Sequence, residues 1–235
     1  MYFPHHYFYA HNQAISGGGF WGVSPEAWAA IGTFLAVIAA LLIALFQDLI
    51  RSWWNRARLD MKINLVPPDC HKIQLKNPQT GEAMGYAIYL RIKVQHIRGK
   101  TAENVEIMIG NFWHIRENGT IDIVRHFLPM NLKWSHFDPP VHSLRIPVGL
   151  FRHCDLGPIL HPGENVLKLD TIVQPNAVEG GEVPNIIRAG RYEFELLLSG
   201  DNVKPVTKRF SFELDNIWSN NEMEMLQDHI KITEI

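Results

Sequence analysis

The chain has 235 residues, of which 20% are charged, and its formal net charge is −2 at pH 7. A nearly neutral chain lacks the basic stripe that general nucleic-acid binders present, so no nucleic-acid partner is expected. Two cysteines allow at most one internal disulfide, which excludes a disulfide-rich secreted scaffold.

The first predicted element is a helix built on the uncharged stretch Ala27–Phe46, AWAAIGTFLAVIAALLIALF. About twenty apolar residues at a rise of about 1.5 Å each match the roughly 30 Å hydrocarbon core of a bilayer. Ser24 and Pro25 suit the start of a helix, as an N-cap and a first-turn proline. We therefore predict a transmembrane helix over residues 25–54, preceded by a short extracytoplasmic head, residues 1–24.

Tryptophans flank the apolar run on both sides, and indole rings favour the headgroup level of a membrane. They are Trp21, Trp28, Trp53 and Trp54. A core helix of a soluble protein is the weaker alternative, because such a helix is rarely so long and so evenly apolar. A cleaved signal peptide is also weaker, because its basic start is missing from residues 1–26.

Basic residues near the run occur only on its C-terminal side. They are Arg51, Arg56, Arg58 and Lys62. Because basic residues next to a span tend to stay in the cytoplasm, we predict a single-pass protein of the cell (inner or plasma) membrane. Its N-terminus is expected outside and its C-terminal domain in the cytoplasm, where a disulfide between the two cysteines is not expected.

Small residues recur at every fourth position of the predicted helix and form one stripe along it. They are Gly32, Ala36, Ala40 and Ala44. Such a stripe lets a second membrane helix approach closely. It therefore predicts self-association or a membrane partner, although alanine is also common in membrane helices that pair with nothing.

After the helix, the hydrophobic pattern changes to the alternation of half-buried strands. The longest alternating segments are residues 86–95, 105–109, 192–198 and 209–214. The turn at Arg98–Lys100 joins the first two, as a hairpin or as a pair that crosses between two sheets. Shorter candidates lie at Leu59–Val66, Ile73–Lys76, Thr120–Val124, Leu144–Val148 and Val166–Thr171.

Many short strands separated by turns, without an amphipathic helix between them, favour an all-β, antiparallel sandwich over a βαβ fold. We assign this sandwich to residues 59–216. The remaining tail, residues 217–235, is predicted to contain a possible short helix that presents Met223, Leu226 and Ile230 on one side.

Two segments of the predicted sandwich carry a resemblance to immunoglobulin-like sandwiches. The segment YLRIKVQHIRGKTAENVEIMI, residues 89–109, resembles their strand, turn and A-x-N-V strand unit. The segment AGRYEFELLLSGDNVKPVTKRFSFEL, residues 189–214, resembles their closing G-x-Y strand pair. Both are similar to segments of uncharacterised prokaryotic single-pass membrane proteins with a β-sandwich after the anchor. The resemblance implies an immunoglobulin-like fold and binding of other proteins, and it transfers no catalytic residue.

The sharpest chemical hypothesis is a structural zinc site. Cys70, His71, His153 and Cys154 supply two thiolates and two imidazoles, a ligand set that tetrahedral zinc accepts. Adjacent side chains of an extended strand point to opposite faces, however, so both members of a pair can bind one ion only at a turn. The alternative is a pair of ordinary reduced thiols, and we assign no metal or cofactor.

Catalytic patterns are weak. His153, Cys154 and Asp155 include a nucleophile, a base and an acid, but direct neighbours in an extended chain cannot line up for catalysis. The chain is therefore expected to be non-enzymatic, a membrane-anchored module for protein interaction or assembly. Its partners would be the lipid bilayer and a second protein or a second copy. The alternatives are a metal-binding or catalytic sandwich and a helix-driven regulator of another membrane protein.

Overall fold

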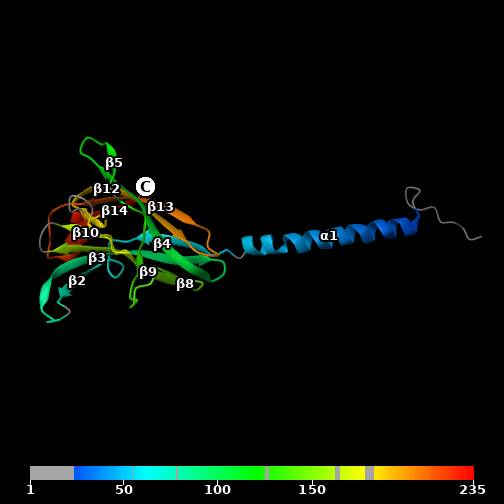
Figure 1. Ribbon diagram of the computed structural model, residues 1–235, viewed down its shortest axis with the longest axis horizontal. Helices are drawn as coiled ribbons and strands as arrows, with labels where there is room; N and C mark the ends of the chain where they lie inside the picture. The colour runs from blue at the N-terminus through cyan, green and yellow to red at the C-terminus, as the bar shows by residue number, and fades with distance from the viewer. Residues whose placement is uncertain (1–23, 55, 78, 125–126, 162–164, 178–182) are drawn as a thin grey trace, which may run out of the picture. The chain divides into compact units, whose positions relative to one another are not determined.

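The computed structural model describes residues 24–54, 56–77, 79–124, 127–161, 165–177 and 183–235 (Figure 1). The chain divides into two compact units, residues 1–51 and residues 52–235. Helix α1 spans Pro25–Trp54, which is the predicted range. Ser24 starts it as expected, because its side-chain oxygen accepts a hydrogen bond from the Ala27 backbone N–H at 3.3 Å.

Helix α1 is the one helix among the described residues that is long and apolar enough to span a membrane. Its segment Glu26–Gln47 has a mean hydropathy of 2.7, and none of it is buried inside the chain. The one hydroxyl of this segment is satisfied within the helix, because Thr33 donates to the Ala29 carbonyl oxygen at 2.8 Å. A helix that is apolar on every side and packed against none of its own chain is typical of a membrane span.

The second unit is a sandwich of two antiparallel sheets, which confirms the all-β prediction (Figure 1). The first sheet has the order β1-β3-β9-β10-β11, with β2 beside β3 and β7 beside β9. Its strands are β1 (Arg58–Ile63), β2 (His71–Lys76), β3 (Ala83–Arg98), β7 (Lys133–Trp134), β9 (Phe151–His161), β10 (Val166–Lys168) and β11 (Ile186–Arg188).

The second sheet has the order β14-β13-β12-β4-β5, with β6 and β8 also beside β4. Its strands are β4 (Ala102–Ile115), β5 (Ile121–Ile123), β6 (Met130–Asn131), β8 (Ser143–Ile146), β12 (Gly190–Ser199), β13 (Val206–Leu214) and β14 (Ile230–Glu234). The end of β4 and its partner β5 project from the rest of the sandwich, as Figure 1 shows.

The connection from β3 to β4 crosses from one sheet to the other, which decides between the two alternatives for this turn. Gly99 makes the crossing with a φ of +99°, a conformation that favours glycine. A side chain there would also collide with the Arg56 backbone carbonyl, which lies against the turn. The Gly99 position therefore fixes how closely the start of the domain approaches this turn.

The core lies between the sheets and consists of the inward-facing side chains of the long strands. Ile92 on β3 and Phe212 on β13 are fully buried, as their alternation predicts. The second sheet contributes a group of aromatic rings, in which Phe112 stacks on Phe194 at a centroid distance of 5.5 Å. Phe194 in turn stacks on Phe210 at 5.5 Å. These contacts tie β4, β12 and β13 together through their side chains as well as their backbones.

Strand β9 is the main element that the sequence did not predict. Alternation fails there because Leu156, Gly157, Pro158 and Ile159 are all buried. The register explains it: Leu90 pairs with Gly157 and Arg91 pairs with Asp155, so Leu156 is an extra residue in a β-bulge. Gly157 has a φ of +145°, and a side chain there would collide with the Lys168 carbonyl of the neighbouring strand.

The predicted tail helix would present Met223, Leu226 and Ile230 on one side. The helical part of the tail is shorter than this, because it ends before Ile230. A short helix α2 (Glu222–Glu224) continues into a π-helical turn η2 (Met225–His229). Ile230 then begins strand β14, which pairs with β13. Met225 and Leu226 are buried in the domain core, whereas Met223 is 41% exposed. Packing against β13 thus overrides the helical pattern after His229.

Candidate functional site

The small-residue stripe of α1 is unpacked in the described chain. Gly32, Ala36, Ala40 and Ala44 are all exposed, and a side chain at Gly32 would meet nothing within 4 Å. None of the described residues covers the stripe, so it is open to a partner of the kind predicted. Trp28 at the start of the helix is 43% exposed.

The other interface and topology residues are only partly described. Trp21, with residues 1–23 of the head, lies outside the described residues. Arg51, Trp53 and Trp54 belong to the last turns of α1, and their side chains lie outside the described residues. The side chains of Arg56, Arg58 and Lys62 are exposed.

The four candidate zinc ligands separate by face. Cys70 and Cys154 are fully buried in the core, whereas the neighbouring His71 and His153 are partly exposed on the outer face of the first sheet. Strand β3 lies between the two pairs, because it pairs with β2 on one side and with β9 on the other. Within the described ranges, no group of three or more His, Cys, Asp or Glu side chains is arranged to hold a metal ion.

Both thiols are occupied by hydrogen bonds to the backbone. The Cys70 sulfur accepts from the Arg91 N–H at 3.4 Å, and the Cys154 thiol donates to the Lys133 carbonyl oxygen at 3.1 Å. Burial raises the pKa of Cys70 to about 11 and raises the pKa of Cys154 well above its ordinary value. Both residues are thus protonated at neutral pH, and a protonated thiol is a poor nucleophile and a poor metal ligand.

A polar cluster covers the outer face of the first sheet, and Asp69 is its most buried member, with 5% of its surface exposed. Its carboxylate accepts hydrogen bonds from Asn64 Nδ2 at 2.7 Å and from His153 Nε2 at 2.8 Å. Lys93 Nζ lies 3.6 Å away. Burial raises the pKa of Asp69, but the two hydrogen bonds and the Lys93 charge outweigh it, so the net pKa is lowered. Asp69 is therefore ionised at neutral pH, which makes His153 Nε2 the donor of their bond.

A second carboxylate organises the neighbouring part of the same face. Asp155 Oδ1 accepts from the Ser135 hydroxyl at 2.6 Å and from Arg91 Nε at 3.1 Å. The same guanidinium reaches His71 Nδ1 at 3.4 Å. Burial lowers the pKa of His71, and the Arg91 charge lowers it further, so His71 is neutral at pH 7 and accepts this bond.

The polar groups of this cluster form hydrogen bonds mainly with one another. A nucleophilic serine needs a base within hydrogen-bond reach, but the Ser135 hydroxyl donates to Asp155 and not to His153. The pair His153 and Asp69 has the geometry of a base with its orienting acid, and it lacks an aligned nucleophile among the described hydrogen bonds. The cluster is thus a network of ion pairs that joins β3, β7 and β9 to the loop before β2.

Sequence reasoning missed most of this cluster. Arg91 and Lys93 lie on the outward parity of the alternating segment 86–95, but their partners Asp155 and Asp69 are distant in the chain. Recognition of β9 as a strand was the missing step, because it sets His153 and Asp155 on the same outer face. The alternation of His153, Cys154 and Asp155 was the available signal.

Comparison with known proteins adds no identity to this geometry: no family matches the chain, and no curated protein matches it.

Proposed function

We propose that the protein is a single-pass protein of the cell membrane, anchored by α1, with its β-sandwich in the cytoplasm as a non-enzymatic interaction module. The observation that carries the proposal is the helix itself. Its segment Glu26–Gln47 has a mean hydropathy of 2.7 and buries nothing against its own chain. Exposed to water, such a surface would drive aggregation, whereas a bilayer supplies the apolar surroundings that it needs.

The cytoplasmic orientation of the sandwich is supported by charge. Lys and Arg are absent from residues 1–26, whereas Arg56, Arg58 and Lys62 follow the helix and are exposed. The reduced state of the sandwich agrees with this side of the membrane, because Cys70 and Cys154 are free and hydrogen-bonded to backbone groups.

Cysteine accessibility in intact cells tests this topology. Val173 is 73% exposed on the sandwich, so a Val173→Cys variant should react with a membrane-impermeant maleimide only after permeabilisation. A Ser16→Cys variant in the head should react in intact cells. Labelling of Val173→Cys before permeabilisation would place the sandwich outside and contradict the proposal. The buried native thiols provide an unreactive background.

The projecting hairpin of β4 and β5 supports an interaction role. Among the described residues, strand β5 pairs with β4 alone, which leaves its other edge open to an added strand. Ile121 and Ile123 lie two residues apart on that strand and are 51% and 70% exposed. Two exposed isoleucines on an open edge suit a protein partner better than water.

A charge on this edge tests the interaction. Ile123→Glu should lower the recovery of partner proteins crosslinked in the membrane and isolated from detergent extracts. Ile217→Glu is the control, because Ile217 is exposed to a similar degree, 59%, but belongs to the loop after β13. Equal recovery with both variants would exclude the β5 edge as the binding surface.

The open stripe of α1 favours a second candidate, in which the helix binds another membrane protein and thereby regulates it. Its Gly32 position leaves room for a close helix–helix approach. Exchange of the span for a polyleucine helix separates the two candidates, because only the helix-driven function depends on the stripe.

A further inference from the structure

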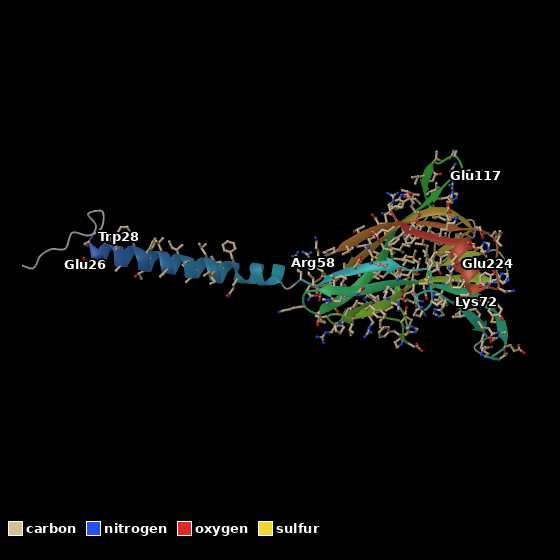
Figure 2. All side chains as sticks on the ribbon, turned by 180° about the vertical axis from the view of Figure 1, so that it is seen from behind. Glu26, Trp28, Arg58, Lys72, Glu117 and Glu224 are labelled. Atoms are coloured by element: carbon tan, nitrogen blue, oxygen red, sulfur yellow. The ribbon has the colours of Figure 1, made fainter. Side chains whose placement is uncertain are left out.

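Three turns gather at one end of the sandwich and form a single surface, which we call the turn surface. They are residues 96–102, 147–152 and 200–205, and residues 56–58 lie against the third of them. Asn202 Nδ2 donates to the Thr101 carbonyl oxygen at 2.8 Å, which joins the first turn to the third. The His96 N–H donates to the Leu150 carbonyl oxygen at 2.9 Å, which joins the first to the second. Figure 2 shows Arg58 at this end of the sandwich and Lys72 and Glu224 at the opposite end.

The turn surface carries an unusual concentration of exposed apolar side chains. Ile97 and Val148 are each 55% exposed, and Leu150 and Phe151 are 46% and 47% exposed. Val148 and Leu150 occupy a tight turn closed by the bond from the Leu150 N–H to the Pro147 carbonyl oxygen at 3.2 Å. The turn therefore holds them outward, because their backbone is fixed on both sides by β8 and β9.

Exposed cations surround these apolar side chains. They are Arg56, Arg58, Arg98, Lys100, Arg152 and Lys204, and none of them forms an ion pair with a described residue. Of two acids nearby, Glu103 pairs with Arg145 at 3.0 Å, whereas Asp201 accepts from the neutral Asn104 amide at 2.7 Å and keeps its charge, so the six cations outnumber it. The surface thus presents unpaired positive charge beside apolar groups.

A shallow hollow of about 370 Å³ lies at one side of the same surface. Arg58 and Lys204 line it together with Leu59, Pro205, Val206 and Thr207. Two cations beside apolar lining residues match the chemistry of an anionic headgroup, whose charge would meet Arg58 and Lys204.

Only a short stretch of chain joins this surface to the last residue of the helix. Ala57 is fixed to the third turn, because its N–H donates to the Asn202 carbonyl oxygen at 2.8 Å and its own carbonyl accepts from Lys204 at 3.0 Å. Ala57 follows Trp54, the last residue of α1, by three residues. Three residues extend at most about 11 Å, so the third turn is joined to the helix end by a short length of chain.

We propose that the turn surface docks on the leaflet into which α1 ends, with Ile97, Val148, Leu150 and Phe151 in the headgroup region and the cations on anionic lipids. This inference rests on the proposed membrane span. Apolar insertion and electrostatic attraction together provide the two signals that stable peripheral binding requires. The docked sandwich then stands in one orientation on the membrane, with α2 and the β2–β3 turn directed away from it.

Lipid-depth quenching tests the docking on the full chain in nanodiscs. A Val148→Cys variant carries an environment-sensitive fluorophore, and the lipids carry a spin label near the headgroup. In discs of phosphatidylcholine with phosphatidylserine, we expect strong quenching at position 148. The same fluorophore on Val173→Cys, which lies outside the turn surface, should be quenched weakly.

Charge removal sharpens the test. Each cation near an anionic leaflet contributes about 1 kcal/mol, so Arg98→Gln, Lys100→Gln and Lys204→Gln together should lower the docked-to-undocked ratio by about 100-fold. The matched control is Lys76→Gln with Lys168→Gln, which removes exposed lysines outside the turn surface and should change nothing. Discs of phosphatidylcholine alone should reproduce the loss seen with the triple variant.

A fluorophore on Phe34→Cys, within α1, distinguishes failure of the docking from failure of the membrane span. Quenching by a spin label deep in the acyl chains at position 34, without quenching at 148, would overturn the docking and leave the span intact. Absence of quenching at both positions would overturn the span itself. Crosslinking between position 148 of two copies in one disc, in place of quenching by lipid, would assign the surface to a second copy and also overturn the docking.

Discussion

Helix α1 and the β-sandwich are both rich in apolar residues, but they dispose of them in opposite ways. In the sandwich, residues such as Ile92, Phe194 and Phe212 are fully buried by strands of the same chain. In α1, Phe34 and Ile43 are each 66% exposed, and no residue of the apolar segment is buried inside the chain. The hydrophobic effect therefore acts within the chain in one region and between the chain and its surroundings in the other.

Because of this difference, substitutions in the two regions should affect different properties of the protein. Substitutions in the sandwich core should change its folding and leave insertion of α1 intact. Substitutions in α1 that keep it apolar should leave both folding and insertion intact and should change only what the helix associates with.

The largest effect is expected in the aromatic core of the second sheet. Phe212→Ala should lower the free energy of unfolding of the sandwich by about 3 to 5 kcal/mol, because it removes a fully buried ring and leaves a cavity. Glu213→Ala, its neighbour on the outer face, should cost about 0.5 kcal/mol or less. Denaturant unfolding of the detergent-solubilised chain, followed by near-ultraviolet circular dichroism, measures both. Equal losses would contradict the assignment of the two faces.

A backbone substitution in β9 should have the next largest effect. Gly157→Ala should cost about 2 to 4 kcal/mol, because the new side chain meets the Lys168 carbonyl and the φ of +145° is unfavourable for alanine. Gly149→Ala is the control, since its φ is also positive, +75°, but the space around it is open. That control should cost about 1 to 2 kcal/mol. The same unfolding measurement would refute the bulge as the cause if the two variants lost equal stability.

The polar cluster should contribute less than the core, and its contribution should depend on pH. The pKa of Asp69 is lower in the folded chain than in the unfolded chain, so the folded state binds fewer protons. Its contribution is complete above the unfolded pKa of about 3.9 and is lost as the pH falls through the folded pKa. Asp69→Asn should therefore cost about 1 to 3 kcal/mol at pH 7 and flatten the decline of stability in acid.

Asp215→Asn is the matched control for Asp69→Asn. Asp215 also accepts from a histidine, His229 at 2.9 Å, but its side chain is 43% exposed. Its loss should cost about 1 kcal/mol or less. Thermal unfolding between neutral and acid pH compares the two, and an unchanged acid profile for Asp69→Asn would show that the buried carboxylate does not control it.

Substitutions in the helix stripe should have the smallest effect on the folding of the sandwich, zero within error. Ala36→Leu or Ala40→Leu should weaken helix association by about 1 kcal/mol, because bulk on the stripe separates the backbones. Leu35→Ala or Leu41→Ala, off the stripe, should not weaken it. All four variants should insert, because the run stays apolar. A membrane two-hybrid assay measures the association, and unchanged signals for the stripe variants would reduce α1 to a tether.

Local patterns in the sequence were sufficient for the helix and for the strands that alternate without interruption. Strands β3, β12 and β13 fall where the parity of residues 86–95, 192–198 and 209–214 places them. Strand β9 was missed because a bulge buries both parities around Gly157. The end of the tail was predicted as helix, but Ile230–Glu234 forms a strand. Its pairing with the distant strand β13 is a long-range contact that the local sequence pattern does not reveal.

The polar cluster could not be predicted for a different reason. Asp69 and His153 lie on segments that only the fold brings together, and neither has a local motif around it. The separation of thiols from imidazoles, in contrast, follows from strand geometry alone, because neighbours on one strand face opposite sides. Long-range pairing decides which residues meet, whereas local geometry decides which cannot.

The ladders of the sandwich also set the order in which the chain acquires structure. Two of the three longest ladders pair segments that are distant in the chain: β3 with β9, residues 86–95 with 151–161, and β4 with β12, residues 106–115 with 191–199. Such distant pairings close large loops and are slow, whereas a helix forms from neighbours. On the proposed membrane anchoring, α1 is ready to partition into lipid during synthesis while β3 and β4 still lack their partners. We expect the sandwich to fold while it is already tethered to the membrane. Its unpaired strands are then confined to the membrane surface, where the density of neighbouring copies governs their aggregation.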